Sequence, residues 1–241
     1  MNERVVVVNA GKMNYDHLLD FSVLSNDVQV YDDSTNAELI ERIQGATVVV
    51  TKEIPVGPEL LSQFPESVKL IVEAGTGYNN IDLDAARAKG ITVCNIPAYS
   101  TERVAHTAIM MLLNFASTMQ QQIGMLARGD RSNFTKHLQV PHTEVNGKTL
   151  GIIGAGHIGM AVVKVARALD MNILIHTRTP KEDSEGIRYV SLDELLAQSD
   201  YISLHCPLND KTKHLINKDT IAKMKSSTII INTGRGALIN E

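Results

Sequence analysis

Short apolar runs alternate with helix-length segments along the whole chain, and this alternation restricts the fold more than any other feature of the sequence. Strands that are separated by helical segments form parallel sheets with helices packed on their faces. In the first hundred residues the apolar runs cover 4–10, 28–33, 46–51, 68–75 and 91–96. Helices are expected between them, at 14–24, 35–45, 57–64 and 82–90. The pattern therefore predicts an α/β domain over residues 1–100.

A second series of the same kind predicts a second α/β domain over residues 101–241. Its strands are expected at 148–154, 172–177, 188–190, 200–206 and 227–232. Its helices are expected at 157–169, 191–199 and 217–225. Residues 101–127 contain no proline and stay apolar for several turns, so they predict one long helix or two consecutive ones. The polar residues 130–147 predict a surface connection.

The composition agrees with parallel sheets and excludes several other classes. The chain is 44% hydrophobic but only 4% aromatic, so its core must be built from aliphatic side chains, as in buried parallel strands. A net charge of −4 argues against nucleic acid as the main partner. Cys94 and Cys206 stand too far apart for a disulfide framework or a metal motif, and we expect both to be reduced. No stretch reaches the length of a membrane span, so we expect a cytoplasmic protein without a membrane partner.

A glycine-rich turn lies where the second series begins. The stretch "TLGIIGAGHIG" places Gly154, Gly156 and Gly159 directly after a predicted strand and at the start of a predicted helix. In this context the first glycine allows a tight turn, the second lets a pyrophosphate approach the backbone, and the third lets the helix pack on the strand. The motif predicts a dinucleotide site; a purely structural strand–helix turn is the alternative.

The residues after the next strand bear on which dinucleotide is bound. An NAD site of this kind has an acidic residue about 20 positions after the glycines, where it accepts a hydrogen bond from the ribose 2′-hydroxyl. Thr177 and Arg178 occupy that place, and Lys181 follows. A hydroxyl and a guanidinium can bind a 2′-phosphate that a carboxylate would repel. We therefore expect NADP or NAD as cofactor, with a preference for NADPH, unless Arg178 only stacks on the adenine or faces solvent.

Four stretches together resemble the D-isomer-specific 2-hydroxy-acid dehydrogenase family, in its glyoxylate/hydroxypyruvate reductase-like branch. They are "VEAGTGYNNIDL" (72–83), "KTLGIIGAGHIG" (148–159), "SDYISLHCPLNDKTKHLIN" (199–217) and "MKSSTIIINTGRGALINE" (224–241). The resemblance implies two Rossmann-like or flavodoxin-like parallel-sheet domains. The first would bind the substrate and the second, expected to be incomplete at the C-terminus, would bind NAD(P).

The resemblance also implies roles for individual residues. Ala74, Gly75, Thr76 and Gly77 match a loop whose backbone N–H groups hold the substrate carboxylate. The matches in the nucleotide domain, beside the three glycines, are His157 and Ile158 over the pyrophosphate, Cys206, Pro207 and Thr212 along the nucleotide, and Thr233, Gly234 and Arg235 beneath the nicotinamide.

Arg235 matches the catalytic arginine of the family. An arginine suits the reduction of a 2-keto acid because it is always charged and its planar fork can reach both the carboxylate and the carbonyl. A surface arginine in a turn is the structural alternative.

The family's acid/base histidine and its glutamate are expected beyond residue 241. We therefore expect a C-terminally truncated chain without reductase activity, and an apolar sheet edge after 227–232 that is exposed or covered by a partner chain. His106, His137, His142 and His205 are not expected to replace the missing histidine.

The leading hypothesis is an NAD(P)H-dependent 2-hydroxy-acid dehydrogenase that reduces a small 2-keto acid such as glyoxylate or hydroxypyruvate. Residues 72–83 contain no cation, which argues against a phosphoglycerate-type substrate. One alternative is a non-enzymatic dinucleotide-sensing protein on the same scaffold. Another is a dehydrogenase that shares only the nucleotide domain, and the match at "EAGTG" counts against it. The resemblance implies a homodimer formed through the nucleotide domain and its helix at 101–127.

Overall fold

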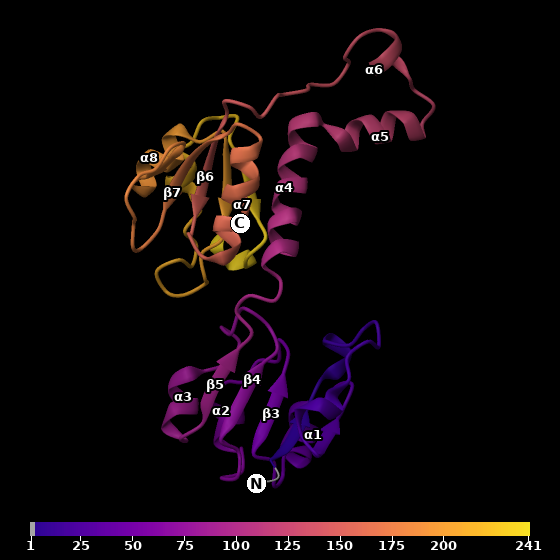
Figure 1. Cartoon of the computed structure of the whole chain (residues 1–241), viewed down its shortest axis with the longest axis vertical. Coiled ribbons are helices and arrows are strands. Elements are labelled where there is room, and N and C mark those ends of the chain that lie inside the picture. The colour runs from indigo at the N-terminus through magenta and orange to yellow at the C-terminus, as the bar shows by residue number, and fades with distance from the viewer. Residues whose placement is uncertain (1–2) are drawn as a thin grey trace. The chain divides into compact units, whose positions relative to one another are not determined.

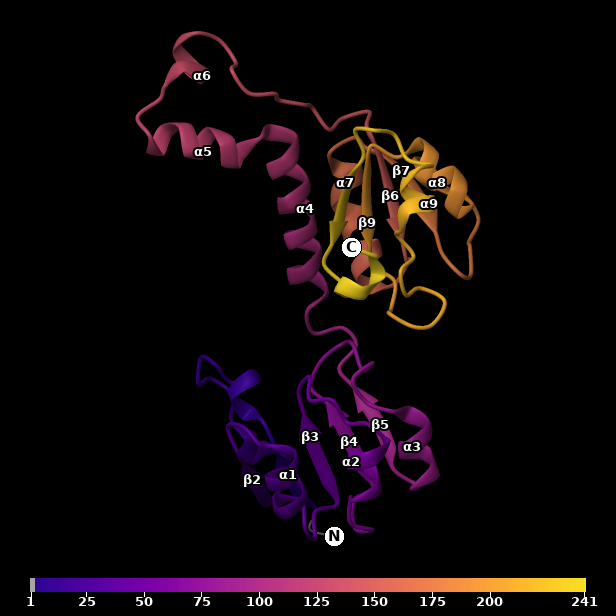
Figure 2. The ribbon, with the colours of Figure 1, turned by 180° about the vertical axis from the view of Figure 1, so that it is seen from behind.

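The computed structural model describes residues 3–241, which form two compact units. One unit ends at Tyr99 and the other begins at Ser100. Each unit contains a five-stranded, wholly parallel sheet that is covered by helices (Figures 1 and 2). The α/β class expected from the alternating runs is therefore confirmed.

The strands of the first unit are β1 (Arg4–Val7), β2 (Asp27–Val30), β3 (Val48–Thr51), β4 (Leu70–Glu73) and β5 (Thr92–Asn95). They lie in the order β2-β1-β3-β4-β5, which is the flavodoxin-like order. The connecting helices are α1 (Asn36–Arg42), α2 (Pro58–Ser62) and α3 (Leu83–Ala88). Leu39, Leu61 and Ala86 of these helices join one buried cluster with the strands, so all three helices cover the same face of the sheet.

The helix expected at 14–24 is wrong. Only two short 3₁₀ turns form in this region, η1 (Ala10–Lys12) and η2 (Phe21–Leu24). The side chain of Asn14 exchanges hydrogen bonds with the backbone of Leu19, and Asp20 accepts one from the Ser22 N–H. Such local side-chain bonds compete with the helical ladder and favour turns.

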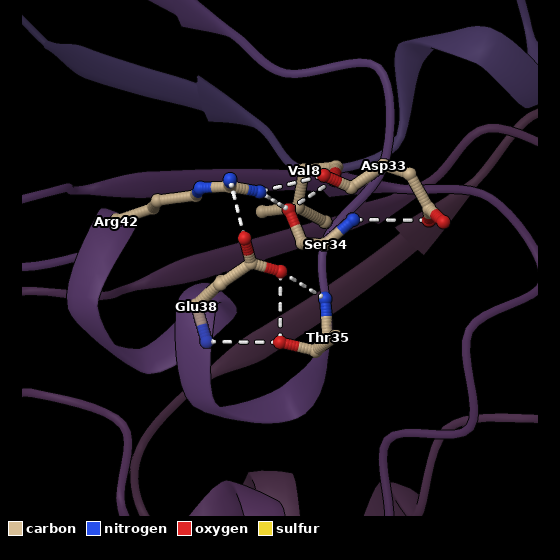
Figure 3. A network of polar contacts seen from close by, with 6 residues as sticks. All are labelled: Val8, Asp33, Ser34, Thr35, Glu38 and Arg42. Carbon is tan, nitrogen blue, oxygen red and sulfur yellow. Dashed lines mark hydrogen bonds and ion pairs between the residues drawn. The ribbon is translucent and has the colours of Figure 1, made fainter.

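The start of α1, in contrast, follows the sequence signal (Figure 3). The Thr35 hydroxyl accepts from the Glu38 N–H, and the Glu38 carboxylate accepts from the Thr35 N–H at 2.9 Å, which makes a capping box. Arg42 donates to the Asp33 carbonyl and to the Ser34 hydroxyl, at 2.6 and 2.5 Å. Ser34 in turn donates to the carbonyl of Val8, so the network ties α1 to the end of β1.

The strands of the second unit are β6 (Thr149–Ile153), β7 (Asn172–His176), β8 (Ile187–Tyr189), β9 (Tyr201–Leu204) and β10 (Ile229–Asn232). They lie in the order β10-β9-β6-β7-β8, which matches five strands of a dinucleotide-binding sheet with β6 as its first strand. The helices are α4 (Thr101–Ser117), α5 (Met119–Ala127), α6 (Ser132–Thr135), α7 (His157–Ala168), α8 (Leu192–Gln198) and α9 (Lys218–Ile221), followed by the 3₁₀ turn η3 (Gly236–Leu238).

Helices cover both faces of this second sheet. Leu112 of α4 and Val163 of α7 pack with Ile152 on one face, whereas Leu195 of α8 packs with Ile202 on the other. Gly151 in β6 allows the second contact, since a Cβ there would lie 2.6 Å from the Leu195 side chain. β10 lies at one edge of the described sheet, and it buries Ile231 in the same cluster as α4.

Of the two alternatives for 101–127, two consecutive helices form, because Thr118 adopts the left-handed conformation with φ of 49° and donates its hydroxyl to the Pro141 carbonyl. One boundary differs from the expected one. The helix expected at 217–225 stops at Ile221, and the chain continues in turns closed by Met224 N–H to Ile221 and Thr228 N–H to Lys225.

Candidate functional site

The expected cofactor residues follow the ends of four neighbouring strands in the second unit. The last residues of these strands are paired across the sheet: Asn232 with Leu204, Leu204 with Ile153, and Ile153 with His176. The strand order reverses between β6 and β9, and ligands of open parallel sheets bind outside the carboxyl ends of the strands at such a point. The segments that begin at Gly154, Thr177, His205 and Thr233 therefore share this edge.

The glycine turn after β6 is shaped by close contacts. Gly154 has φ of +105°, and a Cβ there would lie 2.6 Å from the His205 carbonyl carbon and from the Cys206 nitrogen. A Cβ on Gly159 would overlap the carbonyl oxygen of Gly154. A Cβ on Gly156, in contrast, would meet nothing within 4 Å. Two of the glycines are thus required by the fold, while Gly156 borders open space.

Helix α7 starts at this turn with its first backbone N–H groups available. Gly156 is the residue before the helix, and it offers no side chain to cap those groups. His157 is exposed and Ile158 is half-buried, so the first turn of the helix reaches the surface. Backbone N–H groups and the helix dipole together make such an end a binding site for phosphate groups.

The residues after β7 lie at the surface. Thr177 is half-buried, whereas Arg178 and Lys181 are exposed. The preceding residue, His176, places its Nδ1 3.2 Å from the Val190 carbonyl oxygen. Arg178 thus lies two residues past the end of β7, at this edge of the sheet, and both cations are accessible from solvent.

The segment after β9 forms a closed loop. The Thr212 hydroxyl donates to the Pro207 carbonyl at 2.6 Å and accepts from the Asn209 N–H at 2.8 Å. Burial raises the pKa of the Cys206 thiol, which keeps it protonated. Thr212 therefore fixes the shape of the loop that begins at Cys206.

His205 is half-buried at the start of the same segment. Its Nε2 lies 2.8 Å from the Ser203 hydroxyl, and burial lowers the pKa of the imidazole to about 4. A ring that is held neutral in this way is a poor proton donor at neutral pH. His106, on α4, is exposed and stands 4.0 Å from the Glu102 carboxylate.

The turn after β10 is held by Asn232, a residue that the sequence analysis did not single out. Its side chain accepts from the Gly234 N–H and donates to the Arg235 carbonyl, both at 3.0 Å. The sequence did contain a signal for this role, an asparagine two residues ahead of a glycine. Asn side chains in turns commonly bond to the backbone two residues further on. Arg235 is half-buried, and the Thr233 hydroxyl is buried without a hydrogen-bond partner in the described part of the chain.

The loop 74–77 follows β4 in the first unit. The Ala74 N–H donates to the Thr51 carbonyl at 2.7 Å, which extends the ladder between β3 and β4. The carbonyls of Gly75 and Thr76 accept from the Ile96 N–H and from the Asn95 side chain. The N–H groups of Gly75, Thr76 and Gly77 donate to no acceptor within residues 3–241. Three of the four expected donors are therefore available to an anion.

A lysine from the neighbouring strand lies beside this loop. Lys52 directly follows β3, and its Nζ lies 2.9 Å from the position that a Cβ on Gly75 would take. Residues 72–83 themselves contain no cation, but the end of β3 brings Lys52 to the loop from another part of the chain. The sequence shows a lysine at the end of a predicted buried strand. Its place beside the loop 74–77 follows only from the adjacency of β3 and β4.

Clusters of metal ligands and membrane spans are both absent from residues 3–241. No group of three or more His, Cys, Asp or Glu side chains is placed to hold a metal ion. Within the same range, every helix is too short or too polar to cross a bilayer.

Comparison with known proteins agrees with this geometry. The hydroxypyruvate reductase of Blautia hydrogenotrophica is 40% identical over 208 residues, which cover 85% of this chain and 64% of the relative. Among solved structures, a glyoxylate reductase from Paecilomyes thermophila has a TM-score of 0.85 at 32% identity, over 99% of this chain and 75% of that one. A D-lactate dehydrogenase from Aquifex aeolicus, complexed with NAD and lactic acid, has a TM-score of 0.88 at 31% identity, over 98% and 71%.

The chain thus spans about two thirds of the length of these relatives. Residues 109–241 match the model of the D-isomer-specific 2-hydroxyacid dehydrogenase NAD-binding domain. Together with the strand orders and the glycine turn, these matches show that the chain belongs to the D-isomer-specific 2-hydroxyacid dehydrogenase family.

Proposed function

We propose that the whole protein is an NAD(P)H-dependent 2-hydroxy-acid dehydrogenase that reduces a small 2-keto acid, such as glyoxylate or hydroxypyruvate. The observation that carries this proposal is the row of four strand ends at β10, β9, β6 and β7, from which the expected cofactor residues continue. In this proposal the unit ending at Tyr99 binds the substrate and the unit beginning at Ser100 binds the dinucleotide.

The residues present fit a dinucleotide. Gly156 borders open space at the uncapped start of α7, as a pyrophosphate requires. The partnerless hydroxyl of Thr233 is suited to a polar group such as the nicotinamide amide. The proposed holding residues are Gly154, Gly156, His157, Ile158 and Gly159 for the pyrophosphate, Cys206, Pro207 and Thr212 for the rest of the nucleotide, and Thr233 and Gly234 for the nicotinamide. When bound, the reduced dinucleotide supplies the hydride that, with one proton, converts the keto group into a hydroxyl.

The preferred dinucleotide is proposed to be NADPH. Thr177 and Arg178 stand where an acidic residue would select NADH, and the guanidinium of Arg178 is exposed at that edge. Lys181 adds a second exposed cation nearby in the sequence. A 2′-phosphate can make charge-assisted hydrogen bonds with these groups, whereas a free ribose hydroxyl gains less from them.

The substrate is proposed to be bound through its carboxylate and its carbonyl. The three available N–H groups of Gly75, Thr76 and Gly77 suit the carboxylate, because converging backbone donors bind anions. Arg235 suits the carbonyl, where its fixed charge stabilises the negative charge that develops on the oxygen during reduction. Asn232 positions Arg235 by holding the backbone on both sides of the turn. No residue of this chain is assigned as the proton donor.

We also propose that the protein is a homodimer formed through α4, α5 and the connection that follows. This part of the chain exposes several large apolar side chains. Met110 is 61% exposed, Phe115 57%, Ile123 52% and Phe134 65%. Burying such a surface against a second copy would remove a large apolar area from water.

The test is the loss of nicotinamide absorbance when the whole protein is mixed with NADPH or NADH and either glyoxylate or hydroxypyruvate. Turnover with either acid supports the proposal. Tight dinucleotide binding without turnover of any small 2-keto acid would instead favour the dinucleotide-sensing alternative.

A further inference from the structure

Lys52 lies where an anion bound at the loop 74–77 would meet it. Its Nζ stands 2.9 Å from the position of a Cβ on Gly75, so any residue larger than glycine there would displace the ammonium. The same loop presents the N–H groups of Gly75, Thr76 and Gly77 without acceptors in the described part of the chain. One full positive charge and three backbone donors, from two segments that follow the neighbouring strands β3 and β4, are therefore gathered in one place.

The backbone of Lys52 is held in place by the buried side chain of Asn9, which follows the neighbouring strand β1. Asn9 is fully buried, accepts from the Lys52 N–H at 2.9 Å and donates to the Lys52 carbonyl at 2.5 Å. Asn9 directly follows Val8, whose carbonyl is bound by the Ser34 network at the start of α1 (Figure 3). The base of the lysine side chain is thus fixed before any ligand arrives.

The ammonium of Lys52 is charged but incompletely bonded. Burial alone would lower its pKa, yet contacts with the Tyr99 hydroxyl and the charge of Glu53 outweigh burial and raise the pKa. Both contacts are long, at 3.4 Å to Tyr99 and 3.4 Å to Glu53, whereas good N–H···O bonds measure about 2.7–3.2 Å. Only 16% of the Lys52 side chain is exposed, so most of its length packs inside the unit.

The nearby carboxylates do not use up this charge. Glu73 is fully buried, and its oxygens accept from the Glu53 N–H at 3.0 Å and from the Asn80 side chain at 2.9 Å. The Glu53 carboxylate is 59% exposed, so solvent weakens its attraction for Lys52. Glu73 Oε1 lies 3.2 Å from the same Cβ position on Gly75, but its carboxylate is already engaged by Glu53 and Asn80, so Lys52 and the three N–H groups remain the donors that can meet an anion.

We propose that Lys52 is a substrate-binding residue whose ammonium binds the carboxylate held by the N–H groups of Gly75, Thr76 and Gly77. This inference rests on the proposed function and adds to it a cation contributed by β3. Because the carboxylate is common to all 2-keto acids, Lys52 sets the affinity for the whole class rather than the choice among its members.

The variant Lys52→Met removes the charge and keeps the length of the side chain. In the whole protein it is expected to raise KM for glyoxylate and for hydroxypyruvate by the same factor, at least about tenfold, because a hydrogen bond to a charged group is lost. The kcat and the KM for NADPH should change by less than about threefold, since the hydride and its donor are untouched. Lys69→Met is the matched control, because Lys69 is an exposed lysine just before β4, at the opposite end of the sheet.

Three outcomes would overturn the assignment while leaving the proposed function intact. They are equal substrate KM values for the two variants, a loss confined to hydroxypyruvate, and a fall in kcat at unchanged KM. If Lys52→Met fails to fold, Lys52→Gln carries the same comparison. Wild-type turnover itself tests the proposed function separately.

A binding measurement extends the test to a protein without turnover. Isothermal titration with oxalate, in the presence of the dinucleotide, should show binding to wild type and to Lys69→Met. Binding to Lys52→Met should be weaker by at least about tenfold. Equal affinity for all three proteins, or no oxalate binding to wild type, would contradict the role of Lys52.

Discussion

Gly159 lies directly against the carbonyl oxygen of Gly154, so closely that even a Cβ on Gly159 would overlap that oxygen. This contact seats the first turn of α7 on the end of β6. A substitution at Gly159 would therefore damage the fold and could not report on a ligand. Gly156, between them, borders open space and is the position at which binding can be tested separately from folding.

We expect Gly156→Ala to weaken NADPH binding by at least about tenfold, because a methyl group would occupy the space that the pyrophosphate needs. The midpoint of thermal unfolding should fall only slightly. Gly57→Ala is the matched control, since Gly57 also precedes a helix in extended conformation and also faces open space. Fluorescence titration with NADPH checks this; equal affinities of the two variants would argue against a pyrophosphate at Gly156.

Arg178→Ala is expected to lower the affinity for NADPH about 10- to 100-fold, because charge-assisted hydrogen bonds to the 2′-phosphate are lost. The affinity for NADH should stay unchanged. Lys164→Ala removes an exposed charge from α7 and serves as the control. Parallel titrations with the two dinucleotides decide the matter. An equal loss of affinity for both dinucleotides would indicate that Arg178 stacks on the adenine. Unchanged affinity for both would indicate that Arg178 faces solvent.

The half-buried His205 predicts a specific dependence of stability on pH. Burial lowers the pKa of its imidazole from 6.5 to about 4. Between these values the unfolded chain binds a proton that the folded chain does not, so the free energy of unfolding falls as the pH drops from 6.5 towards 4. At pH 5 the loss attributable to His205 is about 2 kcal/mol relative to pH 7.5.

Urea unfolding of wild type and His205→Gln at the two pH values measures this contribution. The variant should lose less stability than wild type on going to pH 5. His106→Gln, which changes an exposed histidine, should behave like wild type. A variant at position 205 with an unaltered pH dependence would show that the imidazole is not held neutral.

The proposed dimer predicts that Phe115→Asp, at an exposed position of α4, yields a monomer. A carboxylate at a buried interface without a partner costs several kcal/mol, enough to dissociate a dimer at micromolar concentration. Leu18→Asp introduces the same charge at an exposed leucine of the other unit and should leave the assembly unchanged. Sedimentation velocity gives the masses; a dimer that survives Phe115→Asp would place the interface elsewhere.

Features encoded in consecutive residues could be predicted from the sequence. The capping box that begins α1 needs only Thr35 and Glu38, and the glycine turn needs only the stretch 154–159. The strands were predictable for the same reason, since each is a short run of aliphatic residues. The region 14–24 was mispredicted because its apolar spacing resembles a helix, while the side chains of Asn14 and Asp20 bond to the nearby backbone instead.

Contacts between separate strands could not be predicted in this way. Lys52 and Gly75 meet only because β3 and β4 are adjacent, and the clamp of Asn9 on Lys52 needs β1 beside β3. The residues of each strand do not indicate which strands will be neighbours in the sheet. The break at Thr118 was also hidden, because its left-handed conformation is accompanied by a bond to the distant Pro141.

The central claim is that Arg235 acts on a 2-keto acid beside a bound dinucleotide. The most direct measurement compares wild type and Arg235→Gln in the whole protein, by kcat/KM for glyoxylate or hydroxypyruvate and by the dissociation constant for NADPH. We expect a fall in kcat/KM of about a thousandfold, the size of losing one charged group at a developing oxyanion, with NADPH affinity nearly unchanged. A variant that reduces either acid at the wild-type rate would contradict it.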